Sequence, residues 1–264
     1  MPQPHEVIAN LVASGEEVDR MVAGLDAGQW TLPTPSPGWT IAHQIAHLTA
    51  VFHLAGTAAT DPSGFQALTA RLSDDFDANV AAAMAPYLAN PPEVLLERWR
   101  SQRATAEQAL AKVPDGELVP WLVRPLPAPV LAAAGMMELF GHGQDIADAL
   151  RIRREPTDRL RHLVEFGVRT WDFGYLARGR TAPEVEFRFM LTAPSGAIWE
   201  YGPEPAEQVI TGPAVDFCLL VTRRRHRADL ALTATGAEAD QWLDLAQAYR
   251  GPAGPGRTPG QFAG

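Results

Sequence analysis

Apolar residues in the first part of the chain recur about every 3.6 positions, with charged residues between them. This period predicts an amphipathic helix over residues 5–24. Three prolines within residues 32–38 deprive the backbone of donors and disfavour helix, so this stretch is expected to be a loop. Thr40 follows it and is a suitable N-cap for a second helix that runs to about residue 59.

The middle of the chain is also predicted to be helical. Helical periodicity continues over residues 64–89 and 92–113. A proline-rich connector over residues 114–129 contains Trp121, which we expect to act as an anchor or a lid. Residues 130–152 are mostly small and apolar, and this predicts a centrally buried helix.

The pattern changes after residue 156. One more helix is predicted over residues 157–176, and it is followed by alternating apolar and polar positions at 185–191, which are typical of a half-buried strand. Good turn residues at 193–196 predict a hairpin with residues 197–201. The remaining expected elements are a helix at 213–223, a strand at 228–233 and a helix at 237–249.

This order of elements predicts two domains and an α+β fold class. Residues 1–155 are expected to form a helical bundle, and residues 156–252 a smaller α+β domain. Residues 253–264 are rich in glycine and proline, so a flexible tail is expected there.

Composition narrows the classes of function. The 264 residues are 46% hydrophobic and carry a formal net charge of -9, which is typical of a soluble globular protein and gives no indication of nucleic-acid binding. No apolar run reaches the roughly 18 residues that a membrane span needs. Cys218 is the single cysteine, so no internal disulfide is expected, and the start of the chain lacks a secretory signal. Cytoplasmic residence is the default expectation. One lysine, with much alanine, glycine and proline, indicates a GC-rich genome such as an actinobacterial one.

Two pairs of polar residues interrupt the apolar helices. His43 and His47 are four residues apart, as are Glu138 and His142, so each pair lies on one helical face. His47, Glu138 and His142 would together make a three-ligand site with an open position for water or substrate, as catalytic zinc sites have. From the pattern alone, ordinary polar groups on helices remain the alternative.

A family resemblance rests on these residues. The segments Trp39-Thr40-Ile41 and Ala46-His47-Leu48, with Glu138-x₃-His142-x₂-Asp145, resemble the DinB-like metalloprotein superfamily and, more narrowly, the mycothiol-dependent maleylpyruvate isomerase family. The resemblance implies an N-terminal DinB-like four-helix bundle with a smaller C-terminal α/β domain. It also implies that His47, Glu138 and His142 bind a divalent metal, usually zinc.

Two further residues near these ligands are candidates for the catalytic machinery. His43 stands where members of the family tend to carry an acidic residue. It would be a fourth ligand, a proton carrier, or an ordinary histidine that lies on the surface or contacts a ligand residue. Asp145 is one helical turn after His142, where it would accept a hydrogen bond from a histidine or form a surface salt bridge.

Arginines are concentrated at Arg223, Arg224 and Arg225. Planar guanidinium groups suit carboxylates. Arg223 and Arg224 are therefore candidate catalytic residues that would hold a substrate carboxylate, and Arg223 and Arg225 are candidates for binding a thiol cofactor. A solvated helix end is the alternative, because cations are favoured there.

Other polar residues are expected to have no role in the site. His53 is expected to be structural and Cys218 a buried small hydrophobe. Arg98, Arg100 and Arg103 are expected on a solvated face, and the alternative is that one of them reaches the site.

The resemblance implies a metal-dependent enzyme that uses a low-molecular-weight thiol such as mycothiol. The thiol would isomerise, or be transferred to, a small electrophilic substrate. The alternatives are a thiol-independent metal-dependent hydrolase or lyase, and a non-catalytic metal-binding or ligand-binding protein. A monomer or homodimer acting on a small molecule is expected.

Overall fold

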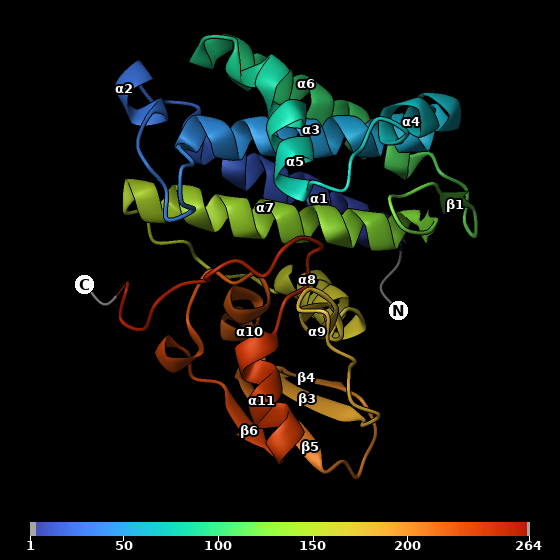
Figure 1. Cartoon of the computed structure of the whole chain (residues 1–264), viewed down its shortest axis with the longest axis vertical. Coiled ribbons are helices and arrows are strands. Elements are labelled where there is room, and N and C mark those ends of the chain that lie inside the picture. Colours follow the sequence, from blue (N-terminus) through green and yellow to red (C-terminus); the bar gives the residue numbers. More distant parts are fainter. Residues whose placement is uncertain (1–3, 263–264) are drawn as a thin grey trace. The chain divides into compact units, whose positions relative to one another are not determined.

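The computed structural model describes residues 4–262. These residues belong to two compact units, Met1–Arg154 and Glu155–Gly264, called here the first and the second unit (Figure 1). Residues 1–3 of the predicted first domain and residues 263–264 of the predicted tail lie outside the described part. None of the helices in residues 4–262 combines the length and the hydrophobicity that a membrane span requires.

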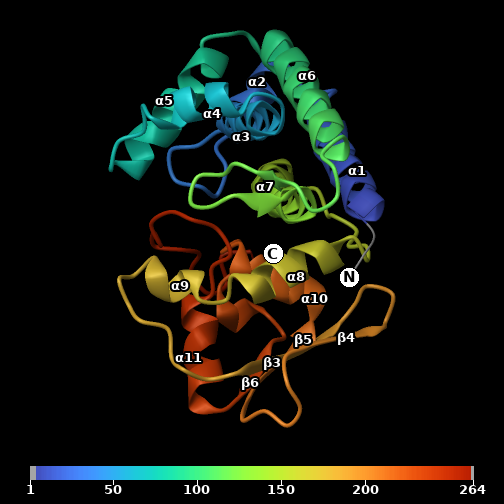
Figure 2. The same cartoon turned by 90° about the vertical axis from the view of Figure 1, so that its right-hand side faces the viewer.

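The first unit is built on four long helices among the described residues (Figure 1, Figure 2). Helix α3 packs against α6 and α7, and α1 packs against α7 and α6. The predicted four-helix bundle is therefore confirmed. Its helices are α1 (Pro4–Val22), α3 (Ile41–Thr60), α6 (Pro92–Ala111) and α7 (Ala128–Leu150).

The packing of α3 against α6 combines a large ring with a small residue. Trp99 of α6 is fully buried and meets Phe52 of α3 edge to face, with ring centroids 5.3 Å apart. One turn further along α3, a Cβ at Gly56 would lie 3.3 Å from the Cα of Ala106, so the glycine allows the two backbones to approach closely. This contact helps fix α3, which carries His47.

Shorter elements fill the gaps of the first unit. The prediction of one helix over 64–89 was wrong, because two helices separated by residues 70–75 occupy this region. Asp61 and Asp75 each cap a helix by accepting a hydrogen bond of 2.9 Å from the backbone N–H three residues later. These elements are α2 (Ala27–Trp30), α4 (Pro62–Thr69), α5 (Phe76–Leu88), β1 (Leu118–Val119) and β2 (Leu126–Pro127).

The connector before α7 is attached to the bundle through an aromatic contact. Strands β1 and β2 pair antiparallel within it. Trp121 stacks on Phe65 of α4 with centroids 6.0 Å apart. The contact gives Trp121 the role of an anchor for this connector.

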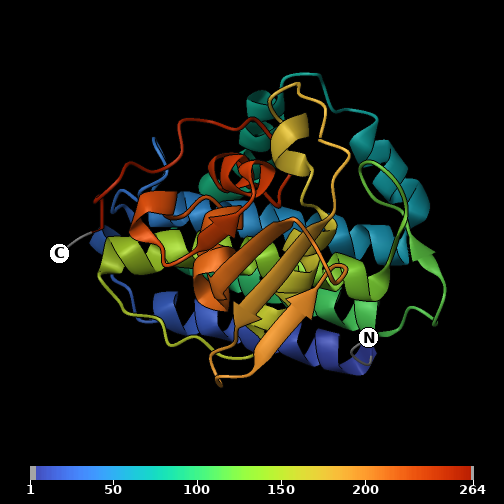
Figure 3. The same ribbon diagram turned by 90° about the horizontal axis from the view of Figure 1, so that it is seen from below.

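The second unit places helices beside a small mixed sheet. Among the described residues the strand order is β4-β3-β5-β6, with β3 and β5 parallel and the other neighbours antiparallel (Figure 3). Phe189, Phe217 and Trp242 pack together in its core. The elements are α8 (Leu160–Arg169), α9 (Phe173–Leu176), β3 (Phe187–Thr192), β4 (Ile198–Tyr201), β5 (Gln208–Pro213), α10 (Ala214–Val221), η1 (Arg227–Asp229), β6 (Thr233–Thr235) and α11 (Ala237–Leu245).

The predicted α+β class and the β3–β4 hairpin are confirmed, whereas strand β5 was not predicted and three predicted details of the second unit were wrong. The predicted helix 157–176 is interrupted at Thr170, whose hydroxyl donates to the Phe166 carbonyl at 2.8 Å and whose ψ of 27 leaves the helical region. The strand expected at 228–233 is a 3-10 turn followed by β6. Helix α11 ends at Leu245, because Ala246 is extended and the N–H of Ala248 donates to the Val221 carbonyl.

The tail makes specific contacts in its described part. The N–H of Gly260 donates to Asp229 Oδ1 at 2.8 Å. The guanidinium of Arg225 lies over the Phe262 ring, 3.7 Å from its centroid. Residues 253–262 thus contact the segment that follows α10.

A buried charged pair lies between α1 and α6. Arg103 was expected on a solvated face, but its side chain is only 13% exposed and its Nε lies 3.7 Å from Glu107 Oε1. Gly15 makes the room, since a Cβ there would lie 2.6 Å from Arg103 Cδ. Glu107 Oε1 and two Arg103 nitrogens have no hydrogen-bond partner within the described residues. Burial raises the pKa of Glu107 to about 7, with the charge of Arg103 opposing the rise and that of Glu16 adding to it.

The raised pKa of Glu107 leads us to expect that Glu107→Gln changes stability in a pH-dependent way. Because the pKa of Glu107 is higher in the folded than in the unfolded protein, protonation of this carboxyl stabilises the fold. This stabilisation is complete below about pH 4.5 and is lost as the pH rises through about 7. The amide does not titrate, so we expect the variant to gain about 2–3 kcal/mol relative to wild type between pH 4.5 and pH 8. Urea unfolding at both pH values measures this change, and Glu97→Gln on the exposed face of α6 is the control. A difference that does not vary with pH would contradict the prediction.

Candidate metal centre

Three side chains from two helices meet in the first unit. Glu138 Oε2 lies 3.3 Å from His47 Nε2 and 3.2 Å from His142 Nε2. One potential ligand atom from each residue lies within 4.8 Å of the others. Among residues 4–262, this is the one group of three or more His, Cys, Asp or Glu side chains that could hold a metal ion.

The local sequence explains why these three residues converge. Glu138 and His142 are one turn apart on α7, so their side chains share a face. His47 projects from α3, which packs against that part of α7. The helix begins at Ile41, after the predicted N-cap Thr40. Two imidazoles and one carboxylate are the donor set of many catalytic zinc sites, so the residues present fit a divalent ion.

The electrostatics of Glu138 suit a metal ligand. Burial by itself would raise its pKa, but hydrogen bonds with His142 and His47, together with the charges of these rings, outweigh burial. The net effect holds the pKa of Glu138 well below its usual range. The carboxylate is therefore the form present at neutral pH, as coordination requires.

Trp39 covers the two histidine rings. Its indole stacks on His142 with centroids 5.8 Å apart and an interplanar angle of 18°. Its centroid lies 5.4 Å from that of His47. The loop before α3 thus supplies an aromatic wall to the site, a role that the sequence pattern of Trp39 did not indicate.

A buried hydrogen-bond network contacts Nδ1 of His142. Gln44, which is fully buried, places its Oε1 2.5 Å from His142 Nδ1. Its Nε2 donates to Thr34 Oγ1 at 2.9 Å and to Asp145 Oδ2 at 3.4 Å. Asp145, also fully buried, accepts a further bond of 2.8 Å from Ser36 Oγ. Asp145 is therefore linked to His142 through Gln44, which sequence reasoning missed.

His43 lies outside the group of three. Its Nδ1 is 2.8 Å from Thr40 Oγ1 and 3.3 Å from the Thr40 backbone N, which closes a capping box at the start of α3. Its ring centroid lies 6.4 Å from that of Trp39. The ring therefore has a structural contact at the edge of the site.

The predicted arginines belong to the second unit, where backbone carbonyls accept their hydrogen bonds. Arg223 has a φ of 57, and its Nη2 lies 3.4 Å from the Gly254 carbonyl oxygen. Arg224 donates to the Thr222 carbonyl at 2.6 Å, and Arg225 to the Arg224 carbonyl at 2.7 Å. Burial and the neighbouring charges of Arg223 and Arg180 lower the pKa of Arg178, so positive charge is concentrated here.

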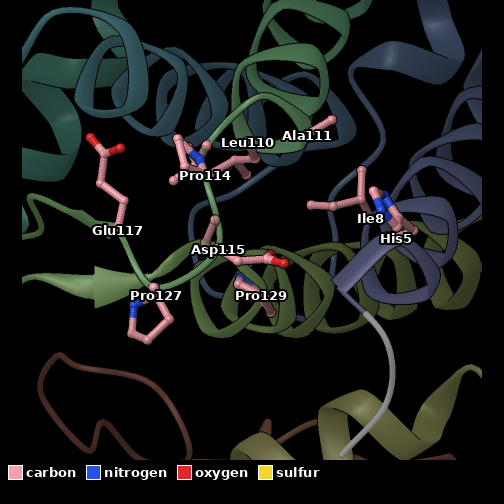
Figure 4. A pocket seen from close by; sticks show the side chains of 12 residues that line it. His5, Ile8, Leu110, Ala111, Pro114, Asp115, Glu117, Pro127 and Pro129 are labelled. Atoms are coloured by element: carbon pink, nitrogen blue, oxygen red, sulfur yellow. The ribbon is translucent and has the colours of Figure 1, made fainter.

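The residues that were expected to have no role in the site are not among the three candidate ligands. His53 Nδ1 lies 3.1 Å from Gln102 Oε1, away from the group of three. Cys218 is buried, as predicted. A pocket of about 240 Å³ elsewhere in the first unit is lined by His5, Asp115 and Glu117 among others, and it contains none of the three candidate ligands (Figure 4).

The helical bundle and the C-terminal α/β part give the chain a DinB-like fold. Residues 11–147 match the family model of the mycothiol maleylpyruvate isomerase N-terminal domain, and the chain belongs to this family. Residues 183–235 are similar to a second family model, described as wyosine base formation.

The chain is also similar to mycobacterial relatives and, in its fold, to two solved structures. Uncharacterized proteins from two strains of Mycobacterium tuberculosis, CDC 1551 and H37Rv, are each 42% identical over 257 residues, which is 97% of this chain and 100% of theirs. Two crystal structures, of the mycothiol-dependent maleylpyruvate isomerase and of a histidine-to-alanine mutant, are similar at 15% identity with TM-scores of 0.57 and 0.58. Each alignment covers 88% of this chain and 93% of that chain, and it shows a shared fold.

Proposed function

We propose that this protein is a metal-dependent enzyme that uses a low-molecular-weight thiol, mycothiol or one of similar chemistry, on a small electrophilic substrate. The observation that carries the proposal is the group formed by His47, anionic Glu138 and His142 in a bundle of the isomerase family. The reaction is isomerisation of the substrate or transfer of the sulfur to it.

The three ligands would hold a divalent ion, with zinc the expected metal. When bound, the ion would act as a Lewis acid that favours the thiolate over the thiol at neutral pH. The chain's own residues set the geometry around it. Gln44 holds the ring of His142, Asp145 holds the amide of Gln44, and Trp39 shields one side of both imidazoles from water.

Proton movement and charge recognition fall to other residues in this proposal. His43 has its Nδ1 engaged with Thr40, so Nε2 is the atom that would exchange a proton with the reacting groups. Arg223 and Arg224 would bind a carboxylate of the substrate, and Arg223 and Arg225 a carboxylate of the thiol. Their planar guanidinium groups suit that purpose.

The isomerisation balances without a further reactant. The sulfur forms a bond to one carbon of a double bond conjugated to a carbonyl, and the electron pair moves onto the carbonyl oxygen. The former double bond rotates as a single bond. Return of the electron pair breaks the C–S bond, restores the double bond in the other geometry and releases the thiol. In the transfer reaction, a proton neutralises the adduct and the C–S bond remains.

Thiol-dependent turnover is the test of this function. We expect zinc-loaded protein to convert maleylpyruvate, or another conjugated electrophile, only when mycothiol is present. His53→Ala is the matched control, because His53 lies on α3 but contacts Gln102 instead of the ligand group. This variant should keep full activity. Turnover that proceeds equally well without any thiol would contradict the proposal and would favour a metal-dependent hydrolase or lyase.

A further inference from the structure

One buried glutamine connects the loop before α3 to a candidate metal ligand. We infer that Gln44 is a positioning residue that fixes the tautomer and orientation of His142. The inference rests on the proposed metal centre and extends it to a residue that has no ligand atom of its own. Its evidence is the set of contacts around the fully buried amide.

The hydrogen bonds determine which way the amide faces. The single hydroxyl proton of Thr34 is donated to the Trp39 carbonyl at 2.9 Å, and a carbonyl cannot donate in return. Thr34 Oγ1 must therefore accept from the group 2.9 Å away on Gln44, which has to be the NH₂ group. Asp145 Oδ2 lies on the same side of the amide and accepts from it as well.

The orientation of Gln44 then determines the state of His142. With Nε2 committed to Thr34 and Asp145, the carbonyl Oε1 faces His142 Nδ1. A carbonyl only accepts, so Nδ1 must carry the proton. A proton on Nε2 would be shared with Glu138 Oε2, 3.2 Å away, and its loss on metal binding leaves the Nε2 lone pair for coordination. The network thus prepares Nε2 for coordination.

The position of Gln44 supports a role beyond packing. It is flanked by the buried residues Ile41, Ile45 and Leu48 on an otherwise apolar face of α3. Burying an amide there carries a desolvation cost that an aliphatic residue would avoid, and this cost is offset only by well-placed partners. Those partners are residues of the 31–39 loop and of α7, so the loop that places Trp39 over His142 also controls the back of the same ring.

The test compares Gln44→Leu with Gln44→Glu in the metal-free protein. Long-range ¹⁵N–¹H NMR of histidine-labelled protein reports which ring nitrogen carries the proton, and the signal absent from His142→Ala identifies His142. In wild type we expect Nδ1 of His142 to carry a proton. Gln44→Leu should give a mixture with the Nε2–H form. Gln44→Glu retains an acceptor for Nδ1–H and should retain the wild-type signature. Zinc affinity should fall roughly 10- to 100-fold in the leucine variant, as is typical when a group that orients a metal ligand is lost.

Gln102→Leu is the matched control, because Gln102 is a glutamine that contacts a histidine outside the ligand group. It should leave the His142 tautomer and the zinc affinity unchanged. Nδ1–H His142 and wild-type zinc affinity in a folded Gln44→Leu variant would overturn the inference while leaving the proposed function intact. If the leucine variant does not fold, an Nε2–H signature in folded Gln44→Glu would overturn it, and the wild-type signature would support it. Absence of thiol-dependent turnover in wild type, with the tautomer as expected, would instead overturn the proposed function.

Discussion

Replacing His142 by alanine is expected to abolish tight zinc binding while the helical bundle stays folded. The imidazole is one of three candidate ligands, and its removal leaves Glu138 and His47 with too few donors to hold the ion firmly. The loss of affinity should exceed the roughly 10- to 100-fold that is typical for the loss of an orienting partner.

Competition with a chromophoric zinc chelator measures this affinity directly. Circular dichroism shows whether the variant is folded, and the control is His53→Ala, which removes an imidazole from α3 outside the ligand group. The control should bind zinc as wild type does. Zinc binding by folded His142→Ala that matched the control would place the metal elsewhere.

Trp99→Ala is expected to cause a large loss of stability. The indole is fully buried between α6 and α3 and meets Phe52 edge to face. Truncation removes a large apolar side chain. The two helices cannot move closer to fill the space, because their backbones already lie close together at Gly56 and Ala106, so a cavity remains. We expect the free energy of unfolding to fall by about 3–5 kcal/mol.

Urea unfolding of the metal-free protein tests this value. Trp121→Ala is a suitable comparison, since Trp121 is partly exposed and stacks on Phe65 at the edge of the first unit. Its loss should be clearly smaller. A cost below about 1 kcal/mol for Trp99→Ala would contradict the packing described for α3 and α6.

The sequence was sufficient to predict the bundle and the candidate ligands. The helices that form the bundle are amphipathic or continuously apolar, and their periodicity is a local property. Glu138 and His142 share a helical face because they are four residues apart, and the resemblance linked them to His47. Both features depend on short spacings, which a sequence displays directly.

Gln44 shows what sequence reasoning could not reach. Its partners are Thr34 in a loop and Asp145 and His142 on another helix, about a hundred residues away. A single glutamine on an apolar helical face is the one local signal, and a surface residue would look the same. The role becomes visible only when the packing of α3 against α7 is known.

Two other features of the structure were not predicted from the sequence. Strand β5 was missed because Gly212 and Pro213 lie at its end, and both residues are uncommon in strands. Arg103 was assigned to a solvated face because arginine is seldom buried. Space left by Gly15 on a different helix reverses that expectation.

X-ray absorption spectroscopy of the zinc-loaded protein, recorded with and without mycothiol, tests the central claim most directly. Without thiol, the zinc should have only nitrogen and oxygen neighbours, consistent with His47, Glu138 and His142. With mycothiol, a sulfur neighbour should appear at about 2.3 Å. A spectrum without sulfur at saturating mycothiol, or a protein that binds no zinc, would contradict the account.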